Sequence, residues 1–541
     1  MKNNLIRKVI GLLGMLVLTD AASAAVTDIG SRRELFVEDS LIERLAGEAT
    51  LRMHNPVPRE IVMEHHEPWE GSGSGYHSVF QDGDLYRMYY KSMTIAPFEE
   101  ANSEFGKKTH PRLCAYAESD DGIHWRKPSL GLHEFDGSTD NNIVFVQEKL
   151  GGLELDAAHP SVFLDTNPDA PADARYKAII RQMSSPISAL IALKSPDGIH
   201  WSLLHDEPVM AGEKYDSQNL AFWDESAGYY RAYWRHFIPG EHDYWSGRRA
   251  IRTATSKDFI HWENKADLAY EDSPPEQLYT NVVKTYHRAP HILLGFPLRY
   301  LERGHEDKTE VERAGLADLS SPEITERWSA SLQALPDLED RLSRGRANDR
   351  YGAGLTDTLL MASRDGVNFK RWNEAFLRPG VERTGTWHYG YQAMAWHMVE
   401  TESVLPGAPR ELSFYASESY WTKPGSVLRR YTLRLDGFVS VRAPMSGGEL
   451  ITKPLKFAGN HLMLNFGTSA AGQVRVEIQD LDGRPLPGFA LDDCAPLYGD
   501  TIERAVTWIS GREVGEFEGQ AVRLRFEVKD ADLYAYQFDD N

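Results

Sequence analysis

Short apolar and aromatic runs alternate with polar turn residues along the middle of this chain. The runs come in groups of three and are rich in Tyr, Val, Ile and Phe, a composition typical of β-strands. They predict strands at 76–80, 86–92 and 113–119; 160–164, 176–183 and 189–195; 220–223, 229–237 and 250–255; 278–285, 291–296 and 358–363; and 391–397, 411–417 and 428–435. The pattern therefore predicts five similar antiparallel units.

A motif of the form Ser-x-Asp-x-x-x-aromatic follows the third strand in four of these units. The copies begin at Ser119, Ser195, Ser256 and Ser363. Asp-Gly, present in three copies, favours a tight turn, and the aromatic residue then returns to the sheet. Because such a residue seals neighbouring sheets, we interpret the motif as architectural and not catalytic. The spacing between consecutive copies is near or above the length of a propeller blade.

The repeats predict an all-β fold, a five-bladed β-propeller at 71–447 with a C-terminal β-sandwich at 448–541. A closed ring of blades leaves only short exposed sheet edges. Within blade four, residues of about 300–351 have the charged periodicity of a helical insertion. Apolar and polar residues alternate at 462–466, 474–479, 505–509 and 522–528, the pattern of a sandwich. The N-terminal segment 25–70 is a candidate for a strand that closes the ring.

Residues 1–24 have the order of a secretory signal peptide. Lys2, Arg7 and Lys8 precede an apolar stretch at 9–18, and Ala22-Ser23-Ala24 supplies a small-residue cleavage site. Ten apolar residues are too few to cross about 30 Å of hydrocarbon, and no later segment is long and apolar enough. We therefore expect a periplasmic or secreted protein with no membrane span.

The charge balance limits the partners of the chain. The chain has 59 Lys and Arg residues and 80 Asp and Glu residues. Its net charge is therefore −21, which disfavours binding to nucleic acid. A polyanionic polysaccharide would require a local basic pocket, so we expect a neutral or weakly charged carbohydrate substrate. Two cysteines, Cys114 and Cys494, rule out a disulfide framework and leave one long-range bridge open.

Carboxylates recur where the innermost strand of each blade begins, and these starts converge on the mouth of the central channel. The four are Glu70, Asp156, Asp216 and Glu276. Glycosidic cleavage requires one carboxylic acid to protonate the leaving oxygen and a carboxylate that attacks or activates water. Like-charge repulsion in such a mouth would raise one pKa above the others. We expect Asp216 and Glu276 to act as acid and base or nucleophile, and Asp156 to orient them or stabilise charge.

Amides, aromatic rings, histidines and arginines accompany these acids. The candidate substrate-binding residues are Glu70, Trp69, His77, His159, Arg181, Gln218, Asn219, Arg235, Tyr279, Asn281, Trp387, His388 and Tyr391. Amides would bind hydroxyl groups and rings would stack on sugars, while the two arginines pair with acids or bind an anionic group, pairing being favoured. The histidines lack the spacing of a transition-metal site. We expect no cofactor, and a structural calcium ion is left open.

The strands Ser78-Val79-Phe80 and Pro160-Ser161-Val162-Phe163, with the turn motifs, resemble the five-bladed propeller glycosidases. That superfamily includes invertases, levansucrases, arabinanases and β-xylosidases, and several members carry a C-terminal β-sandwich. The resemblance implies three catalytic acids. This chain departs from the family motifs: its first blade lacks Trp-x-Asn-Asp-Pro-Asn-Gly, His159 precedes Pro160 where the family has Asp, and the third blade lacks Glu-Cys. Asp156 and Asp216 are therefore the nearest candidates, offset by a few residues.

The favoured function is a secreted glycoside hydrolase acting on an oligo- or polysaccharide at the channel mouth. A glycoside phosphorylase is an alternative that would require a phosphate subsite built from Arg181, Arg235 or a similar group. A non-catalytic carbohydrate-binding propeller would use the same mouth without cleavage. A scaffold for protein partners would instead expose an apolar patch.

Overall fold

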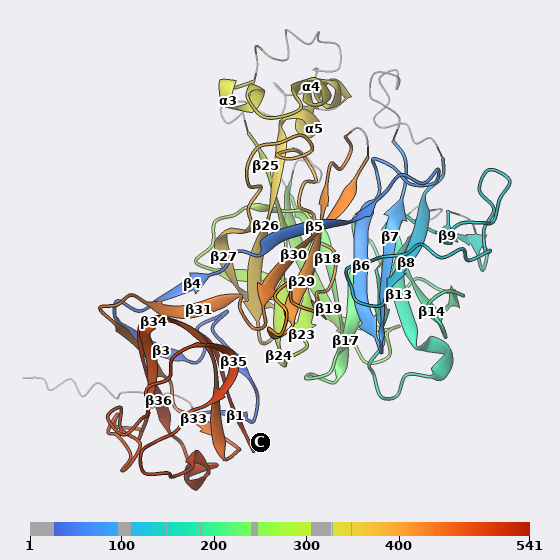
Figure 1. The fold of residues 1–541 in the computed structure, drawn as a ribbon. Helices are drawn as coiled ribbons and strands as arrows, with labels where there is room; N and C mark the ends of the chain where they lie inside the picture. Colours follow the sequence, from blue (N-terminus) through green and yellow to red (C-terminus); the bar gives the residue numbers. More distant parts are fainter. Residues whose placement is uncertain are drawn as a thin grey trace, which may run out of the picture.

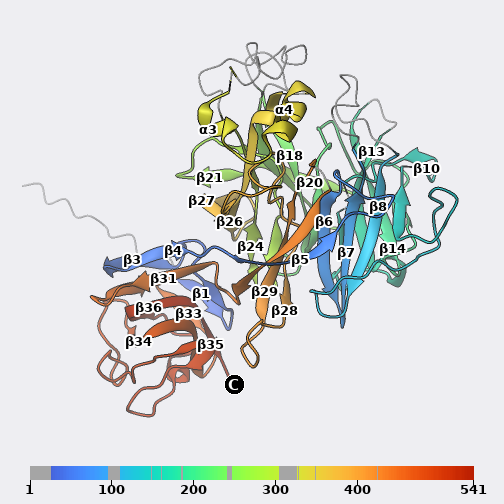
Figure 2. The ribbon, with the colours of Figure 1, turned by 45° about the horizontal axis from the view of Figure 1, so that its top comes forward.

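The computed structural model, drawn in Figure 1, is built mainly from β-strands. It describes residues 26–95, 110–147, 149–159, 161–183, 187–239, 247–303, 326, 328–347, 349–422 and 425–540. Figures 1 and 2 show a large body of antiparallel sheets in a propeller-like arrangement and a smaller lobe that contains the C-terminus. The predicted all-β class is confirmed.

Three successive sheets follow the predicted units closely, and strands that are neighbours in sequence pair in the sheet. In sheet order their strands are β6 (Gly75–Asp82), β7 (Leu85–Ser92), β8 (Leu113–Ser119) and β9 (Ile143–Val146); β12 (Val162–Leu164), β13 (Tyr176–Gln182), β14 (Ala189–Ser195) and β15 (Ser202–Leu203), with β16 (Met210–Ala211) also on β14; and β17 (Leu220–Asp224), β18 (Tyr229–Ile238), β19 (Arg248–Ser256) and β20 (Trp262–Asp267). A small hairpin, β10 (Lys149–Leu150) with β11 (Leu153–Glu154), precedes the second sheet, and a short η1 (Ala172–Ala174) lies within it. Pro160, at the start of one predicted strand, lies outside the described residues.

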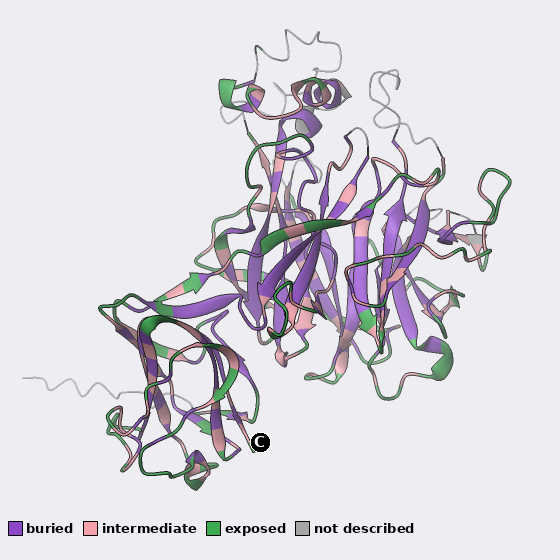
Figure 3. Cartoon of the chain, viewed as in Figure 1, coloured by how far each residue is buried: buried purple, intermediate pink, exposed green. Residues whose placement is uncertain are grey.

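Two further sheets complete the large body. The fourth contains β21 (Ala269–Glu271), β22 (Gln277–Leu278), β23 (Lys284–Tyr286), β24 (Ala289–Gly295), β25 (Leu298–Glu302), β26 (Gly354–Ser363) and β27 (Asn368–Leu377); the fifth has the order β28 (Val399–Thr401), β29 (Glu411–Glu418), β30 (Val427–Arg434) and β5 (Val57–Glu64). Its outer strand β5 comes from before the first sheet in the sequence and is largely exposed (Figure 3). An isolated bridge between Ser78 and Trp396 joins the fifth sheet region to β6. The N-terminal segment therefore contributes a strand to the last sheet of the body.

The repeated turns hold themselves and one another in place. In the first copy, Asp121 Oδ1 accepts hydrogen bonds from the N–H groups of Ile123 and His124, both at 2.8 Å. Gly122 takes the left-handed φ of 73° that the turn requires. A tyrosine from a neighbouring sheet donates to the glycine carbonyl in three copies: Tyr415 to Gly122, Tyr89 to Gly198 and Tyr233 to Gly366. Each turn thus fastens one sheet to the next.

Aromatic side chains fill the space between the inner strands. Trp396 is fully buried, and its ring lies 6.3 Å from that of Phe163 and 6.4 Å from that of Phe222. Its indole N–H donates to the Val283 carbonyl at 2.9 Å, next to β23. Because these groups come from four regions of the ring of sheets, the centre of the body is packed with side chains.

The smaller lobe combines both ends of the described chain. Its eight-stranded sheet contains β2 (Glu34–Leu35), β3 (Ile42–Gly47), β4 (Thr50–Met53), β31 (Val439–Ala443), β32 (Gly448–Thr452), β34 (His461–Gln479), β35 (Asp500–Ala505) and β36 (Arg523–Asp539). A separate parallel pair joins β1 (Thr27–Gly30) to β33 (Leu455–Phe457), and η2 (Val514–Phe517) precedes β36. The strands between Thr27 and Met53 therefore fold with the C-terminal strands.

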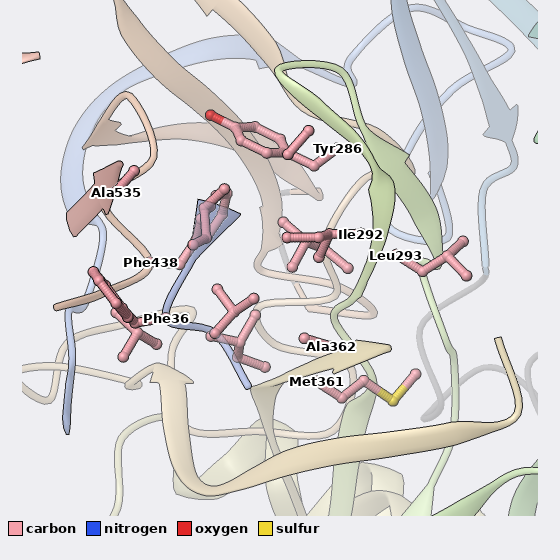
Figure 4. Close-up of a cluster of buried hydrophobic side chains, with 14 of the residues drawn as sticks. Phe36, Tyr286, Ile292, Leu293, Met361, Ala362, Phe438 and Ala535 are labelled. Carbon is pink, nitrogen blue, oxygen red and sulfur yellow. The ribbon is translucent and has the colours of Figure 1, made fainter. Parts of the chain in front are cut away.

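A buried contact joins the lobe to the fourth sheet. Figure 4 shows apolar side chains of both parts meeting, with Phe36 and Ala535 on one side and Ile292 and Met361 on the other. Beside them, Asp436 is fully buried and accepts hydrogen bonds that include one from Tyr286 Oη at 2.7 Å. The two parts thus share one hydrophobic core.

Several predicted elements differ from the structure. Residues 391–397 form no strand because Gln392 and His397 adopt φ of 58° and 76°, which breaks an extended chain. The predicted strand 278–285 is divided between β22 and β23, with Val282 at φ 45° between them. The strand predicted at 505–509 ends at its first residue, because β35 stops at Ala505.

The predicted insertion is partly helical. Its described helices are α3 (Ala330–Gln333), α4 (Leu338–Ala347) and α5 (Asp349–Ala353), while β25 occupies its beginning. Residues 304–325 of the insertion lie outside the described residues, as do residues 1–24. Figures 1 and 2 place α3 and α4 at one end of the large body.

The two cysteines are free and buried in separate parts of the molecule. Cys114 lies on β8 and Cys494 in the lobe. Burial raises the pKa of both thiols. The long-range bridge that the sequence left open is absent.

Candidate functional site

Four tyrosines, one on β6 and three in segments outside the strands, line a small cavity in the large body. The cavity measures about 30 Å³, and its lining residues are Gly75, Tyr76, Tyr279, Thr280, Leu298, Tyr389, Gly390, Ala393, Ser417 and Tyr420. Such a volume admits only water-sized groups, so a sugar would rest at its opening. We use the name 'mouth' for these four tyrosines together with the charged and polar residues around them. The residues of the mouth are Tyr76, Tyr279, Tyr389, Tyr420, Lys91, Arg112, Asp156, His159, Arg181, Asp216 and Arg235.

Tyr76 connects three sheets at the centre of the mouth. Its φ of 50° is rare for a residue with a side chain and marks local strain. Its ring lies 4.8 Å from that of His159, and its carbonyl accepts from Gln218 Nε2 at 3.3 Å. Burial and the neighbouring Tyr279 and Tyr420 raise the pKa of its hydroxyl well above the usual range, and Asp216 adds to this shift. The hydroxyl therefore stays protonated, and Asp216 lies within electrostatic reach of it.

Asp156 is fully buried among cations beside the mouth. Its Oδ1 lies 3.0 Å from Arg112 Nη1 and its Oδ2 3.0 Å from His159 Nδ1, while Arg181 Nη1 lies 3.7 Å from Oδ2. Burial raises the pKa of Asp156, but His159 and Arg112 outweigh it and hold the pKa well below its usual range. Burial lowers the pKa of His159. The arrangement is a charged carboxylate that orients a neutral imidazole.

Asp216 presents a reachable carboxylate near Tyr76. Its side chain is 40% exposed, whereas its partner Arg235 is 3% exposed and bonds Asp216 Oδ1 through Nη2. The Arg235 guanidinium also lies 5.3 Å from the ring centroid of Tyr279. A buried, fixed arginine thus holds a carboxylate that a ligand can touch.

Glu276 lies in a separate arginine cluster. Arg299 Nη1 lies 2.9 Å from its Oε1, and Arg371 Nη2 lies 2.9 Å from its Oε2. The two arginines belong to β25 and β27, and Arg299 also pairs with Asp357 of β26. Within the described residues no contact joins Glu276 to Asp156, Asp216 or the four tyrosines. The structure therefore brings together two of the three predicted catalytic carboxylates, and their catalytic roles stay predictions.

The acid and aromatic residue predicted for the first blade are held by that blade. Glu70 is buried and accepts from Tyr90 Oη at 2.5 Å and from Lys127 Nζ at 2.6 Å. The indole N–H of Trp69 donates to Asn142 Oδ1 at 2.8 Å. Both side chains are engaged within their own region of the sheet.

The remaining predicted rings face main-chain or neighbouring groups. His77 is buried 3.1 Å from His65 between their Nε2 atoms, and burial lowers its pKa well below the usual range. Both ring nitrogens of His388 lie 2.9 Å from main-chain carbonyls, and burial lowers its pKa to about 3. Tyr391 Oη donates to the Pro379 carbonyl, and the Trp387 indole donates to the Gly380 carbonyl. These contacts support the wall that carries Tyr389.

The predicted amides stabilise the loops that shape the mouth. Asn219 Nδ2 donates to the Tyr215 and Ser217 carbonyls at 3.1 and 2.8 Å. Asn281 Nδ2 lies 3.5 Å from the Tyr233 carbonyl. Gln218, besides its bond to Tyr76, lies 3.4 Å from Ser78 Oγ.

Sequence reasoning assigned no role to Lys91, Arg112, Tyr76, Tyr389 or Tyr420. The Lys91 ammonium lies 4.9 Å from the Tyr76 ring centroid and 4.8 Å from that of Tyr420, and it donates to Tyr420 Oη at 2.6 Å. A polar lysine inside the predicted strand 86–92 was the available signal. Arg112 and Tyr420 lie at strand ends, where the sequence carries no comparable mark.

Metal and membrane features were also searched in the described part of the chain. No group of three or more His, Cys, Asp or Glu side chains there could hold a metal ion. None of its helices is sufficiently long and apolar to cross a bilayer.

No family model matches this chain, and no curated protein matches it. Similar solved structures include an N-acetylgalactosamine deacetylase from F. plautii in complex with blood group B trisaccharide, at 11% identity and a TM-score of 0.40, covering 71% of this chain and 94% of that one. A thermostable family-43 glycoside hydrolase has 11% identity and a TM-score of 0.40, with 70% and 96% covered. An endo-arabinase from Bacteroides thetaiotaomicron has 10% identity and a TM-score of 0.36, with 71% and 97% covered.

The similar structures thus include glycoside hydrolases of propeller-type families, the class that the strands and turn motifs resemble. At these identities and TM-scores, we base the function on the residues of the mouth alone.

Proposed function

We propose that this chain is an exported glycoside hydrolase that cleaves a carbohydrate at the mouth of a five-bladed propeller. The five sheets of the large body, antiparallel except for the pairing of β21 with β27, are the proposed blades, and the strands of the lobe form the proposed β-sandwich. Export rests on residues 1–24, whose basic start, apolar stretch and small-residue end have the order of a signal peptide.

Asp216 is the observation that carries the proposal. A catalytic carboxylate must be reachable by substrate and fixed in orientation. Asp216 meets both conditions, because it is 40% exposed and bonded to the buried Arg235. The adjacent Tyr76 and Tyr279 supply aromatic faces and hydroxyl groups, the mixture that small-molecule sites use to bind and orient a ligand.

The other polar groups take supporting roles in this proposal. Asp156 is too buried to touch a substrate, so it orients His159 and stabilises charge. Glycosidic cleavage needs a second acid or base across the bond. In this proposal Glu276 is the second acid or base. To act on the substrate, Glu276 must break its ion pair with either Arg299 or Arg371 when the substrate binds.

The test measures sugar release by the mature protein from a panel of oligosaccharides. We expect release by the wild type and its loss in Asp216→Asn and Glu276→Gln, each with an unchanged circular dichroism spectrum. Asp492→Asn, on a fully exposed lobe carboxylate, is the matched control. Retained sugar release in both Asp216→Asn and Glu276→Gln would reject the assignment. Binding without any product would favour a non-catalytic carbohydrate-binding propeller.

A glycoside phosphorylase is the second candidate, and Arg181 is the observation that favours it. The Arg181 side chain is 24% exposed and lies 3.7 Å from Asp156, beyond hydrogen-bond distance, so its exposed part could pair with a phosphate oxygen. Products formed with and without inorganic phosphate separate the two activities. Release of a sugar 1-phosphate only when phosphate is present would establish the phosphorylase.

A further inference from the structure

We propose that the mouth recognises an acidic sugar through Arg181, so that the substrate carries a carboxylate or sulfate group. The proposal rests on the proposed function and names the class of its substrate. It also replaces the expectation of a neutral substrate, which followed from the net charge of the whole chain.

The charges around Asp156 do not balance within the described residues. Asp156 carries one negative charge, while Arg112 and Arg181 each carry one positive charge and both face it. Burial lowers the pKa of His159, so the imidazole adds no charge near neutral pH. One positive charge therefore remains uncompensated on this side of the mouth.

The geometry assigns that surplus to Arg181. Both oxygens of Asp156 are already occupied, Oδ1 by Arg112 and the Ala158 N–H, and Oδ2 by His159. Arg181 Nη1 lies 3.7 Å from Oδ2, beyond hydrogen-bond distance, and its buried Nε has no hydrogen-bond partner in the part of the chain that the structure describes. A buried donor without an acceptor is costly. An oxyanion on a ligand would pair with the solvent-exposed part of the Arg181 side chain and offset its charge.

Access and shape suit such a ligand. The Arg181 side chain is 24% exposed, so one part of its guanidinium meets solvent while Nε is buried. The planar guanidinium fork matches the two oxygens of a carboxylate or sulfate. The Nε of Arg235 also has no hydrogen-bond partner among the described residues, but Arg235 is only 3% exposed and its terminal nitrogen already bonds Asp216. Arg181 is thus the arginine of the mouth with capacity for an anion.

Other cations gather on the same side. Lys91 and Arg112 both lower the pKa of His159, which places their charges within reach of one ring. Lys91 also lies against Tyr76, whose ring contacts His159. These positive groups come from β7, the residue before β8, and β13. They form the local basic pocket that an acidic sugar requires on a protein of net charge −21.

The experiment compares matched acidic and neutral sugars by titration calorimetry. Oligosaccharides ending in glucuronate or galacturonate are tested against their carboxyl-reduced counterparts, with a sulfated probe and inorganic phosphate as further arms. We expect the wild type to bind an acidic probe at least about tenfold more tightly than its neutral counterpart, a ratio typical of one charge-assisted contact. The preference should weaken as salt is added.

Single-residue variants test which side chain causes the tighter binding of acidic sugars. Arg181→Gln should lose it, Arg181→Lys should retain part of it, and Arg442→Gln, an exposed arginine of the lobe, should retain all of it. Circular dichroism verifies that each variant folds. Loss of preference in Arg181→Gln with neutral binding unchanged supports the proposal.

The outcomes separate this proposal from the proposed function. Equal affinity for acidic and neutral probes would overturn the acidic-sugar proposal and leave hydrolysis standing. Acid-selective binding without sugar release would overturn hydrolysis and support acid recognition. Binding of phosphate alone at Arg181 would assign the site to a phosphorylase, and binding of no probe would overturn both proposals.

Discussion

The acids of the repeated turns and the acids of the mouth share one chemistry but obtain their partners differently. Asp121 is held by Ser119, Ile123 and His124, all within three residues of it. Asp156 has similar local partners in the Ala158 N–H and His159, but Arg112, which precedes β8, holds it as well, and Asp216 is held by Arg235 of β18. Local partners alone make a carboxylate part of the architecture, whereas an added distant partner places it where a ligand can reach its neighbours.

Exposure alone does not distinguish the two classes. The side chain of Asp121 is 41% exposed and that of Asp216 is 40% exposed. What differs is the surroundings: Asp121 faces its own turn, and Asp216 lies beside a buried arginine and tyrosine rings. The comparison shows that a reachable acid becomes a candidate for catalysis through its long-range environment.

Activity should show the largest difference between the classes. Asp216→Asn removes the proposed catalytic carboxylate, and kcat should fall about 10²–10⁴-fold. Asp121→Asn should leave kcat unchanged because the turn lies outside the mouth. Initial rates on the substrate identified by the oligosaccharide panel measure both. An equal decrease of kcat in Asp216→Asn and Asp121→Asn would contradict a functional difference between the acids of the mouth and those of the turns.

Stability should separate Asp156 from the turns. Asp156→Asn leaves Arg112 and Arg181 in a buried site without their counter-charge, and it should cost about 3 kcal/mol of unfolding free energy. Urea unfolding followed by tryptophan fluorescence measures the loss. If Asp156→Asn lowers the unfolding free energy by less than a substitution in one of the turns does, the mouth is more hydrated than the burial of Asp156 indicates.

A single turn should contribute less. Asp258→Ala removes an acceptor for the N–H groups of Ile260 and His261, at 2.9 and 2.8 Å, and should cost about 1–2 kcal/mol. The same unfolding experiment applies, with Glu263→Ala on exposed β20 as the control. The third copy is informative because Phe259 replaces glycine there at φ 68°. No loss would show that this turn is held by Ser256 and Phe259 packing instead.

The pH dependence of the turns should be the smallest effect. Burial raises the pKa of Asp121, Asp197 and Asp258, but hydrogen bonds from their turns outweigh it and hold each pKa well below its usual range. A depressed folded-state pKa stabilises the fold above the unfolded value of about 3.9 and loses this effect as pH falls through the folded value. The stability gap between wild type and the triple alanine variant should therefore shrink between pH 5 and pH 2. A constant gap would contradict the assignment.

Most of the strands could be predicted because their signals are local. The predicted 86–92 and 113–119 match β7 and β8, and 189–195 matches β14, since alternation and the turn motif lie within the segments themselves. The prediction failed at 391–397, where backbone turns at Gln392 and His397 leave no mark in composition. The acids of the mouth were found for the same local reason, but their partners were not.

The sequence by itself determined the repeated antiparallel units, the turns that end them and the acids at their starts, because each depends on residues a few positions apart. Only the tertiary structure decided that Asp216 bonds the buried Arg235, that Glu276 pairs with Arg299 and Arg371, and that Arg181 Nε has no hydrogen-bond partner among the described residues. It also decided that β5 joins β30. Pairing and burial of charges depend on which strands lie side by side in the folded chain. Those strands are far apart in the sequence, so no local pattern specifies their contacts.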